Sequence, residues 1–253
     1  MKLDVEKTVI AIVKFIRDYY KKNNLKGAVI GLSGGKDSSV VLSLFVKALG
    51  SSNILALWLP INSSDSDYKD ALMLANMYNV ELKTHDLKNV YNAFIRDIKS
   101  YNLQDNVLID ANINIKPRLR MMCLYYYASM MSKIKNGVYI VAGTSNKCER
   151  FVGYFTKGGD NVSDINVLSN LTVSEVIAIG KYLNIPDKII YKTPNDGLSG
   201  ISDEEKLGVK YSDIEKVLNN EKVDIKTKEK IEKLHQNNLH KFNIPEFKEI
   251  KCD

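Results

Sequence analysis

The sequence predicts an α/β fold, specifically a doubly wound parallel sheet with flanking helices. Short apolar runs of strand length alternate with segments of helical periodicity, and this alternation indicates βαβ units. The apolar run at 28–32 breaks at two glycines and opens directly into a helical segment. Ligands bind at the carboxyl ends of the strands in such a sheet, so this break marks the expected site.

Each element follows from its spacing or composition. Val9, Ile12 and Ile16 recur at helical spacing, so residues 3–22 are predicted to form an amphipathic helix ahead of the first strand. Strands are then predicted at 28–32, 54–59, 80–84 and 138–142, and helices at 38–49, 67–78, 90–98 and 113–135. The segment 215–233 is rich in Lys, Glu and Asn and is predicted to form solvated helices.

The predicted helix at 113–135 carries apolar or aromatic residues on nearly every face, among them Met121, Leu124, Tyr126 and Met130. A helix of this kind is buried on more than one side, and one sheet surface cannot cover it. Deep burial within a larger core would explain the pattern. A subunit interface would explain it as well, and in a chain of one domain this interpretation is favoured, so a homodimer is expected.

Composition and charge limit the class of protein. The 253 residues show no linker or shift in composition, so one domain spanning 1–253 is expected. With 36 Lys plus Arg against 30 Asp plus Glu, the formal net charge is +6, which suits an anionic nucleotide but is too diffuse to indicate a nucleic-acid partner. The sequence contains neither an apolar run of about 18 residues nor an export signal, so no membrane partner and a cytoplasmic location are expected.

The three cysteines, Cys123, Cys148 and Cys252, are far apart and form no C-x-x-C motif. This spacing argues against a structural zinc site and against a disulfide framework. They are expected to be reduced thiols without a catalytic role.

The most informative stretch is Ser33-Gly34-Gly35-Lys36-Asp37-Ser38, at the break after the first predicted strand. Several unpaired backbone N–H groups converge at such a turn, which indicates a phosphate-binding site. The stretch is not a P-loop, because that motif would require glycine at Ile30 and Ser or Thr at Asp37. An ordinary strand-to-helix turn, capped by Ser and Asp, is the structural alternative.

This stretch resembles the S-G-G-x-D-S signature of the ATP pyrophosphatase superfamily, whose members cleave ATP between the α and β phosphates and adenylate an oxygen of their substrate. In that interpretation the glycines allow the backbone to approach the pyrophosphate, and the serines donate hydrogen bonds. Asp37 would hold Mg²⁺ among the phosphate oxygens.

Further motifs, in order along the chain, resemble those of ammonia-dependent NAD synthetases. They are N-x-K-x-R-x-R-M at 114–121, G-T-x-N-K-x-E at 143–149, G-Y-F-T-K-x-G-D at 153–160, P-x-D-G-L at 194–198 and N-x-H-K at 238–241. The resemblance covers residues 31–241. It implies an adenine nucleotide alpha hydrolase-like fold of the ATP pyrophosphatase type.

The resemblance implies an ATP-dependent amidation. ATP adenylates the nicotinate carboxylate of deamido-NAD, pyrophosphate leaves, and ammonia attacks the mixed anhydride to give NAD and AMP. Adenylation is needed because a carboxylate is anionic and its oxygen leaves poorly. The chain is expected to hold only a synthetase portion, without a glutaminase domain, so free ammonia or ammonia from a separate partner is the expected nitrogen source.

The resemblance also assigns roles to individual residues. Asp37 and Glu149 would be the catalytic metal ligands, with Mg²⁺ as the cofactor, and Thr144 would contact ATP. The ATP loop would consist of Gly31, Leu32, Ser33, Gly34, Gly35, Lys36, Asp37 and Ser38. Deamido-NAD would be held by Arg118, Lys157, Asp160, Asp164, His240 and Lys241. The segment 158–163 would be a mobile loop that orders over the substrate and excludes water.

Two positions depart from the family pattern. Val173 stands where the family usually has Lys, and Asn195 stands where it usually has Thr or Ser. Both family residues contact ATP phosphates, so both positions are retained as ATP-binding, although Val cannot replace a charge-assisted contact. Lys36, Lys181 or Lys192 could supply the missing charge.

These departures keep two other functions open. A divergent ATP pyrophosphatase could adenylate another carboxylate or a tRNA base, and tRNA thiolation would require sulfur-handling cysteines and a larger basic surface. A non-catalytic nucleotide sensor would bind ATP without turning it over. Incubation with ATP, Mg²⁺, deamido-NAD and ammonium separates the three functions.

Overall fold

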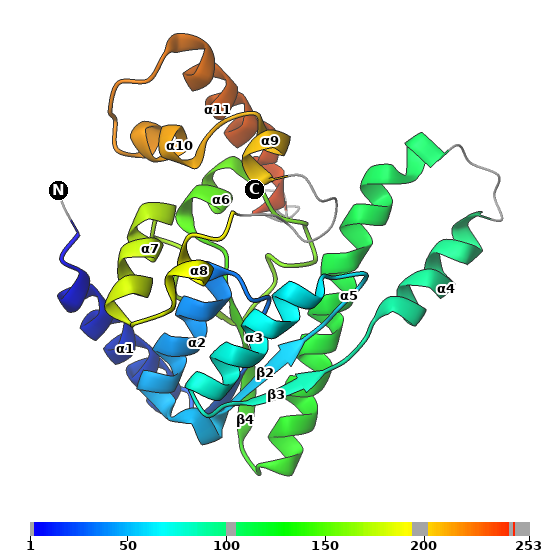
Figure 1. Cartoon of the computed structure of the whole chain (residues 1–253), viewed down its shortest axis with the longest axis vertical. Coiled ribbons are helices and arrows are strands. Elements are labelled where there is room, and N and C mark those ends of the chain that lie inside the picture. The colour runs from blue at the N-terminus through cyan, green and yellow to red at the C-terminus, as the bar shows by residue number, and fades with distance from the viewer. Residues whose placement is uncertain (1–2, 100–104, 194–201, 243–244, 246–253) are drawn as a thin grey trace, which may run out of the picture.

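The computed structural model describes residues 3–99, 105–193, 202–242 and 245. Within these ranges the centre of the protein is a parallel sheet of five strands in the order β3-β2-β1-β4-β5 (Figure 1). The strands are β1 (Leu25–Gly31), β2 (Ile54–Trp58), β3 (Glu81–Thr84), β4 (Val138–Gly143) and β5 (Ile165–Asn166). The predicted doubly wound α/β fold is confirmed.

β1 is the central strand, and its residues alternate between two apolar cores. Ala28 and Ile30 belong to one core and Val29 to the other, and all three are fully buried. Helices cover both faces of a parallel sheet, which explains why the inner strands β1 and β2 are apolar on both sides. The chain passes from β1 outward to β3 and then returns to β4 on the other side of β1. A ligand cleft is expected where the order reverses, between β1 and β4.

Helices pack on both faces of the sheet. One face carries α1 (Val5–Lys22), α2 (Lys36–Leu49), α3 (Asp65–Met77), α7 (Val173–Tyr182) and α8 (Asp187–Ile190), each of which contributes buried apolar residues to one core. The other face carries α5 (Asp105–Ile134), with α4 (Lys88–Lys99) beside it. Figure 1 shows α4 and the first half of α5 extending beyond the sheet as an arm.

Most predicted elements lie within two residues of the observed bounds. The exceptions are β1, which begins at residue 25 rather than 28, and α5, which begins at 105 rather than 113. The added part of α5 lies in the arm, where Val107 and Ile109 are exposed, so it has no core-facing periodicity from which a helix could be predicted. With two residues, β5 is too short to be predicted from its pattern.

The predicted helix at 113–135 is present within α5 and buries one face. Leu119, Cys123 and Met131 belong to the core beneath the sheet, whereas Met122 and Tyr126 are 54% and 67% exposed. Deep burial in a larger core is therefore the wrong explanation for the outer face of this helix. A subunit interface stays the proposed explanation for the apolar residues on that outer face.

The C-terminal helices form a third apolar cluster with α6 (Lys147–Val152) and α7. They are α9 (Asp203–Leu207), α10 (Tyr211–Leu218) and α11 (Ile225–Asn238), with α10 and α11 at the top of Figure 1. The 3-10 helix η2 (Leu239–Lys241) follows α11 directly. The helices predicted at 215–233 are present, but they are not wholly solvated. Ile214 and Ile231 are fully buried in the same cluster as Val152 and Val173, because one apolar residue per turn is enough to anchor a polar helix.

Cys123 and Cys148 are buried free thiols, as expected, and Cys252 lies outside the described residues. In the part of the chain that the structure describes, no helix has both the length and the apolar character needed to span a membrane.

An ion-pair cluster fastens α3 to α8 and the residues after it. Asp70 is 7% exposed, and its two carboxylate oxygens lie 2.9 Å from Lys188 Nζ and 2.8 Å from Lys192 Nζ. Lys192 Nζ also lies 2.6 Å from Asp67 Oδ1. Burial opposes the ionisation of Asp70, but the hydrogen bonds from the two lysines outweigh it and lower the pKa of Asp70 below its ordinary 3.8.

We expect Asp70→Asn to lower the free energy of unfolding by about 1–3 kcal/mol at neutral pH, because Lys188 loses its anionic partner and Lys192 retains only Asp67. The pKa of Asp70 is lower in the folded than in the unfolded protein. Its stabilising effect is therefore complete above pH 3.8 and is lost as the pH falls through the folded-state pKa. Urea unfolding across the acid range measures this, and a difference between the two proteins that stayed constant with pH would contradict the role of the carboxylate.

Candidate active site

The loop between β1 and α2 lies at the carboxyl edge of the sheet, where the strand order reverses. Gly34 in this loop has φ +76°, and a Cβ atom there would lie 2.5 Å from the carbonyl oxygen of Asp67 in α3. Glycine alone meets both conditions without strain. The loop is therefore seated against the first turn of α3, while its neighbours Ser33 and Gly35 line a cavity.

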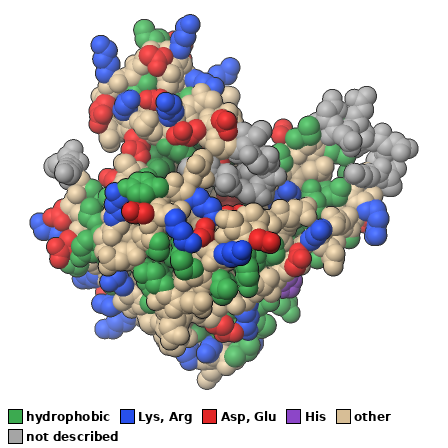
Figure 2. Space-filling view, viewed as in Figure 1, with side chains coloured by type: hydrophobic (Ala, Val, Ile, Leu, Met, Phe, Trp, Pro, Cys, Tyr) green, Lys and Arg blue, Asp and Glu red, His purple; other side chains and the backbone are tan. Residues whose placement is uncertain are grey.

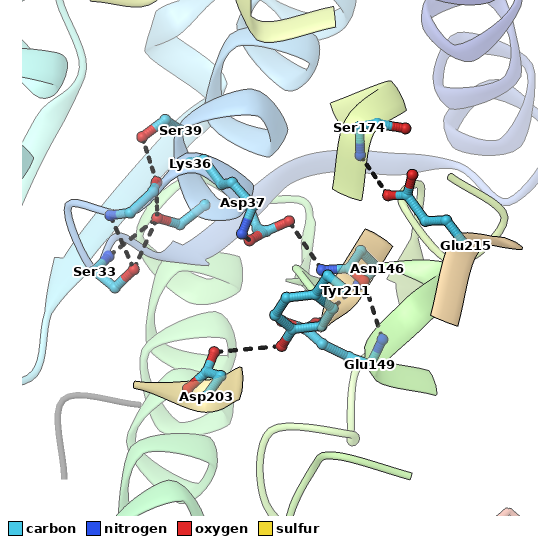
Figure 3. Close-up of polar contacts among 12 residues, drawn as sticks. Ser33, Lys36, Asp37, Ser39, Asn146, Glu149, Ser174, Asp203, Tyr211 and Glu215 are labelled. Atoms are coloured by element: carbon cyan, nitrogen blue, oxygen red, sulfur yellow. Dashed lines mark hydrogen bonds and ion pairs between the residues drawn. The ribbon is translucent and has the colours of Figure 1, made fainter. Parts of the chain in front are cut away.

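Serine hydroxyls close this loop into a tight turn (Figure 3). Ser38 Oγ accepts from Ser33 N at 3.2 Å and donates to Gly35 O at 3.1 Å, and Ser39 Oγ donates to Gly35 O at 2.6 Å. The N-cap of α2 is Gly35, and no side chain caps this helix. The alternative of a turn capped by Ser and Asp is therefore wrong, because the carboxylate of Asp37 contacts other side chains instead.

Asp37 and Glu149 are linked through Asn146 (Figure 3). Asn146 Nδ2 donates to Asp37 Oδ1 at 3.3 Å, and Asn146 N donates to Glu149 Oε2 at 3.0 Å. Glu149 N donates back to Asn146 Oδ1 at 3.0 Å, so Asn146 and Glu149 form the capping box of α6. Asn146 is fully buried and contacts both carboxylates. Asp37 and Glu149 line the same cavity, so the start of α6 holds the two side chains together there.

Negative charge is concentrated around this pair. Burial, and then the charge of Asp37, raises the pKa of Glu149 well above its ordinary 4.5. Burial and the charges of Glu149 and Asp203 also raise the pKa of Tyr211 far above its usual range. Asp203 accepts hydrogen bonds from Tyr154 OH at 3.1 Å and from Tyr211 OH at 3.4 Å. A cation bound among these groups would relieve their repulsion.

Lys36 supplies one positive charge to this cluster. Its Nζ lies 2.8 Å from Asp37 Oδ2, and its side chain is 6% exposed. Burial alone would lower the pKa of Lys36, but the charges of Asp37 and Glu149 outweigh that effect and raise it. The lysine is therefore charged at neutral pH.

The donor set fits a hard divalent cation such as Mg²⁺. Carboxylate oxygens are its preferred protein ligands, and sites of phosphate chemistry usually supply one or two of them. In the described ranges, no three His, Cys, Asp or Glu side chains gather closely enough to hold a metal by themselves. Asp37 and Glu149 could therefore hold the ion only together with phosphate oxygens and water.

A cavity of about 580 Å³ lies over the loop and extends to α5 and η2. Leu59, Met121 and Leu124 contribute apolar lining. The basic side chains that line it are Lys36, Arg120, Lys192, Lys206 and Lys241. Acidic side chains line it as well, among them Asp37, Glu149 and Asp203, so the cavity suits an anionic ligand that binds together with a cation and has an apolar part, as a nucleotide has.

Most of the predicted ATP-binding residues line this cavity. They are Gly31, Leu32, Ser33, Gly35, Lys36, Asp37, Ser38 and Thr144, and Glu149 lines it as well. Val173 is not among the cavity-lining residues that the structure describes. It is 8% exposed and belongs to the third apolar cluster, so this position contributes to packing. Asn195 lies outside the described residues.

The three lysines considered for the missing charge differ in position. Lys36 and Lys192 line the cavity. Lys181 is held over the ring of Tyr191, with Nζ 4.8 Å from the ring centroid, and it is not among the described residues that line the cavity. A compensating contact from Lys181 is therefore not supported, and the choice narrows to the other two.

The residues predicted to hold deamido-NAD divide into groups. Asp160 and Lys241 line the cavity. Arg118, Lys157 and His240 form a chain of contacts, in which Arg118 Nη2 donates to Lys157 O at 3.2 Å and Lys157 Nζ donates to His240 O at 2.9 Å. This chain joins α5 to η2 through exposed side chains. The binding of deamido-NAD by Arg118, Lys157 and His240 stays a prediction.

Asp164 uses both carboxylate oxygens within the protein. Val141 N donates to Oδ2 at 2.8 Å, and Tyr125 OH donates to Oδ1 at 3.2 Å. The side chain thereby joins β4 to α5. A bound dinucleotide would have to share these oxygens or replace one of the two contacts.

The segment predicted to be a mobile loop is held by its own side chains. Asn161 Oδ1 accepts from Gly158 N at 2.9 Å and from Gly159 N at 3.4 Å. Asp160 Oδ1 accepts from Thr156 N at 2.9 Å. The movement of this segment over a substrate stays a prediction.

Asp67 and Asp203 also line the cavity, yet the sequence carries no signal that marks them as site residues. Each lies in the first turn of a helix whose N-cap is serine, Ser64 and Ser202. Acidic residues are common at such positions for helix stability alone. Their place at the cavity depends on how α3 and α9 pack, which local spacing does not encode.

Neither described cysteine is a reactive thiol. Burial raises the pKa of Cys148 to about 12 and also raises the pKa of Cys123. Both side chains are buried. A thiolation mechanism that carries sulfur on one of these two residues finds no support.

The fold and the loop together define the class: adenine nucleotide alpha hydrolase-like proteins of the ATP pyrophosphatase type. Within it, the family model described as NAD synthase matches residues 8–245, and the chain therefore belongs to the NAD synthase family.

Individual relatives agree with this assignment. The chain is 36% identical to the NH(3)-dependent NAD(+) synthetase of Carboxydothermus hydrogenoformans, over 97% of this chain and 98% of that protein. Among solved structures it is similar to NMN synthetase from Francisella tularensis, with a TM-score of 0.88 and 36% identity over 98% of this chain and 100% of that one. The NH3-dependent NAD synthetase from Campylobacter jejuni gives a TM-score of 0.77 and 31% identity, also over 98% and 100%.

Proposed function

We propose that the protein is an ammonia-dependent NAD synthetase, a ligase that forms a C–N bond. It converts the nicotinate carboxylate of deamido-NAD into the amide of NAD at the expense of ATP, with release of AMP and pyrophosphate. The observation that carries this proposal is the cavity in which the Gly34 loop, Asp37, Glu149 and several lysines meet, in a chain of the NAD synthase family.

The first step is adenylation of the substrate. A nicotinate oxygen attacks the α-phosphorus of ATP, and the bond to the bridging oxygen of pyrophosphate breaks. Backbone N–H groups in the first turn of α2 and the hydroxyl of Ser38 would hold the departing phosphates. Mg²⁺ held by Asp37 and Glu149 would supply positive charge to the phosphate oxygens.

The second step is transfer of the acyl group to nitrogen. Ammonia attacks the acyl carbon, the bond to AMP breaks, and the nitrogen loses a proton. Asp160 and Lys241 line the cavity and would position the substrate. The segment 158–163 would exclude water, since an exposed acyl adenylate hydrolyses.

The direct experiment is incubation of the purified protein with ATP, Mg²⁺, deamido-NAD and ammonium. NAD and AMP should form in equal amounts. Absence of both products would refute the proposal, and binding of ATP without turnover would favour the sensor function.

A second substrate is favoured by one observation, the similarity to the Francisella tularensis NMN synthetase at a TM-score of 0.88. The same two steps applied to nicotinate mononucleotide would give NMN. The two substrates share the nicotinate ribose phosphate and differ by an adenylate half. Parallel assays with each substrate separate them, and a higher kcat/KM for the mononucleotide would make it the assigned substrate.

We also propose that the protein forms a homodimer through the exposed faces of α4 and α5, which include the arm. Figure 2 shows hydrophobic side chains gathered on this arm. The exposed apolar residues of these two helices include Val90, Phe94, Val107, Ile109, Met122 and Tyr126. An exposed apolar surface of this kind is typical of a subunit interface.

We expect Tyr126→Asp to convert the dimer into a monomer, because it places a charge on a side chain that is 67% exposed in the single chain and would be buried in the dimer. Light scattering at working concentration measures the mass. Phe15→Asp on α1 is the matched control, since Phe15 is 52% exposed and lies outside α4 and α5, and this variant should remain dimeric. A monomeric wild-type protein would contradict the proposal.

The remaining expectations are proposals of the same kind. A cytoplasmic location is supported by the two free thiols, Cys123 and Cys148. A single domain spanning 1–253 is supported by the third apolar cluster, in which residues of α6 and α7 pack with the C-terminal helices. Free ammonia as the nitrogen source is supported by the similarity to NH3-dependent NAD synthetases of other organisms.

A further inference from the structure

Lys36 is a buried cation in an unfavourable place. Its side chain is 6% exposed, and it is the first residue of α2, where the helix dipole disfavours positive charge. Lysine is almost never buried without a partner. The partner is the adjacent residue, Asp37, whose Oδ2 lies 2.8 Å from Lys36 Nζ. Successive residues of a helix do not face each other, so the long lysine side chain folds back to reach this carboxylate.

This contact engages the carboxylate that would bind metal. Asp37 Oδ1 accepts from Asn146 Nδ2 at 3.3 Å, and Oδ2 accepts from Lys36, so both oxygens are in use. Asn146 is fixed by the capping box of α6 and cannot withdraw without moving that helix. Lys36 can withdraw, because its flexible stem lets the ammonium turn within the cavity that it lines.

We propose that the Lys36 ammonium and a divalent cation are alternative partners of Asp37 Oδ2. Metal binding displaces the ammonium, which then contacts the phosphates of the nucleotide in the same cavity. The lysine thus neutralises Asp37 while no metal is bound and adds a phosphate contact once metal is bound. This inference rests on the proposed use of metal and ATP, and it is tested by binding instead of turnover.

Lys192 provides a matched comparison for Lys36. It lines the same cavity and carries the same charge, but its Nζ lies 2.6 Å from Asp67 and 2.8 Å from Asp70. A general effect of cavity charge on metal binding would appear in variants of either lysine. Displacement from Asp37 would appear only in variants of Lys36.

Binding of Mn²⁺ without nucleotide, followed by electron paramagnetic resonance, tests the competition. Lys36→Met should bind Mn²⁺ about tenfold more tightly than the wild type, because the metal no longer has to displace an ion pair. Lys36→Gln can still donate to Asp37 and serves as a second variant if Lys36→Met folds poorly; it should shift the affinity in the same direction. Lys192→Met should change it by less than about threefold. Equal Mn²⁺ affinities of the wild type and the Lys36 variants, including no measurable binding to any of them, would overturn the inference.

Binding of a non-hydrolysable ATP analogue at saturating Mn²⁺ tests the second half. Lys36→Met should weaken nucleotide binding about tenfold, because a charge-assisted phosphate contact is lost. The same substitution therefore acts with opposite sign on metal and on nucleotide. Unchanged nucleotide affinity would show that the ammonium does not reach the phosphates. Neither binding measurement requires that the protein form NAD. Failure of the proposed function would be seen in the assay of NAD and AMP formation, independently of these two results.

Discussion

Glu149→Gln is expected to lower kcat/KM by about a hundredfold or more while leaving the fold intact. The substitution removes one of the two negative charges that would hold Mg²⁺ beside the phosphates. It preserves the start of α6, because a glutamine oxygen can accept from Asn146 N as the carboxylate oxygen does. Turnover and thermal unfolding of the same preparation measure the two effects.

The stability of the metal-free variant should equal or exceed that of the wild type. Burial and the charge of Asp37 raise the pKa of Glu149 in the folded protein, so its ionisation costs more there than in the unfolded chain. The wild type therefore loses stability as the pH rises from 4.5 through the folded-state pKa, and the glutamine variant does not. Thermal unfolding at several pH values in the presence of a chelator measures this difference.

Glu175→Gln is the matched control for Glu149→Gln. Glu175 forms the capping box of α7 with Thr172, in the same geometry that Glu149 has at α6, but it is absent from the described cavity lining. Its replacement should change turnover by less than about threefold. Normal activity of Glu149→Gln, or equal losses in both variants, would refute the role given to Glu149.

Gly34→Ala is expected to reduce both stability and activity. The new Cβ would lie 2.5 Å from the carbonyl oxygen of Asp67, a backbone atom that can move only if α3 moves. We expect the free energy of unfolding to fall by about 2–4 kcal/mol, because overpacking adds to left-handed backbone strain. We expect turnover to fall by about a hundredfold in the folded fraction, because a shift of about 1 Å misplaces the phosphate-binding turn.

Gly50→Ala is the control that introduces backbone strain without a contact like that between Gly34 and Asp67. Gly50 has φ +81°, close to the +76° of Gly34, but no atom lies within 4 Å of a Cβ at that position. With ψ 149°, Gly50 adopts a conformation that is nearly restricted to glycine, so the control should cost about 1–3 kcal/mol of stability and leave turnover unchanged. Equal losses of stability in the two variants would show that the contact between the loop and α3 contributes nothing.

Local sequence patterns were sufficient to predict most of the fold. The spacing of apolar residues predicts the order of strands and helices from α1 to β4. A helix buried on one face shows apolar residues at helical spacing, and a strand buried on both faces shows a short apolar run. It does not predict that β4 pairs with β1, since a strand's pattern records that it is buried but not which strand lies beside it. The early start of α5 leaves no such record, because that part of the helix lies beyond the sheet.

The candidate site also has one part that the sequence predicts and another that only the structure shows. Its loop is predictable because Gly34, Ser38 and their neighbours are contiguous, and the ordered motifs after them indicate the family from sequence alone. The structure alone decides that Asn146 bridges Asp37 and Glu149, and that Asp203 joins them from α9.

The sequence thus predicts Ser33 to Ser38 to be an adenylating turn, whereas tertiary structure decides the surroundings of Lys36 and of the distant position Val173. Lys36 is a buried partner of Asp37, and Val173 belongs to an apolar cluster. The physical reason is that the conformation of a turn depends mainly on adjacent residues, whereas burial depends on how the sheet and its helices pack. The contact of Asp37 with Asn146, 109 positions along the chain, also forms only after that packing.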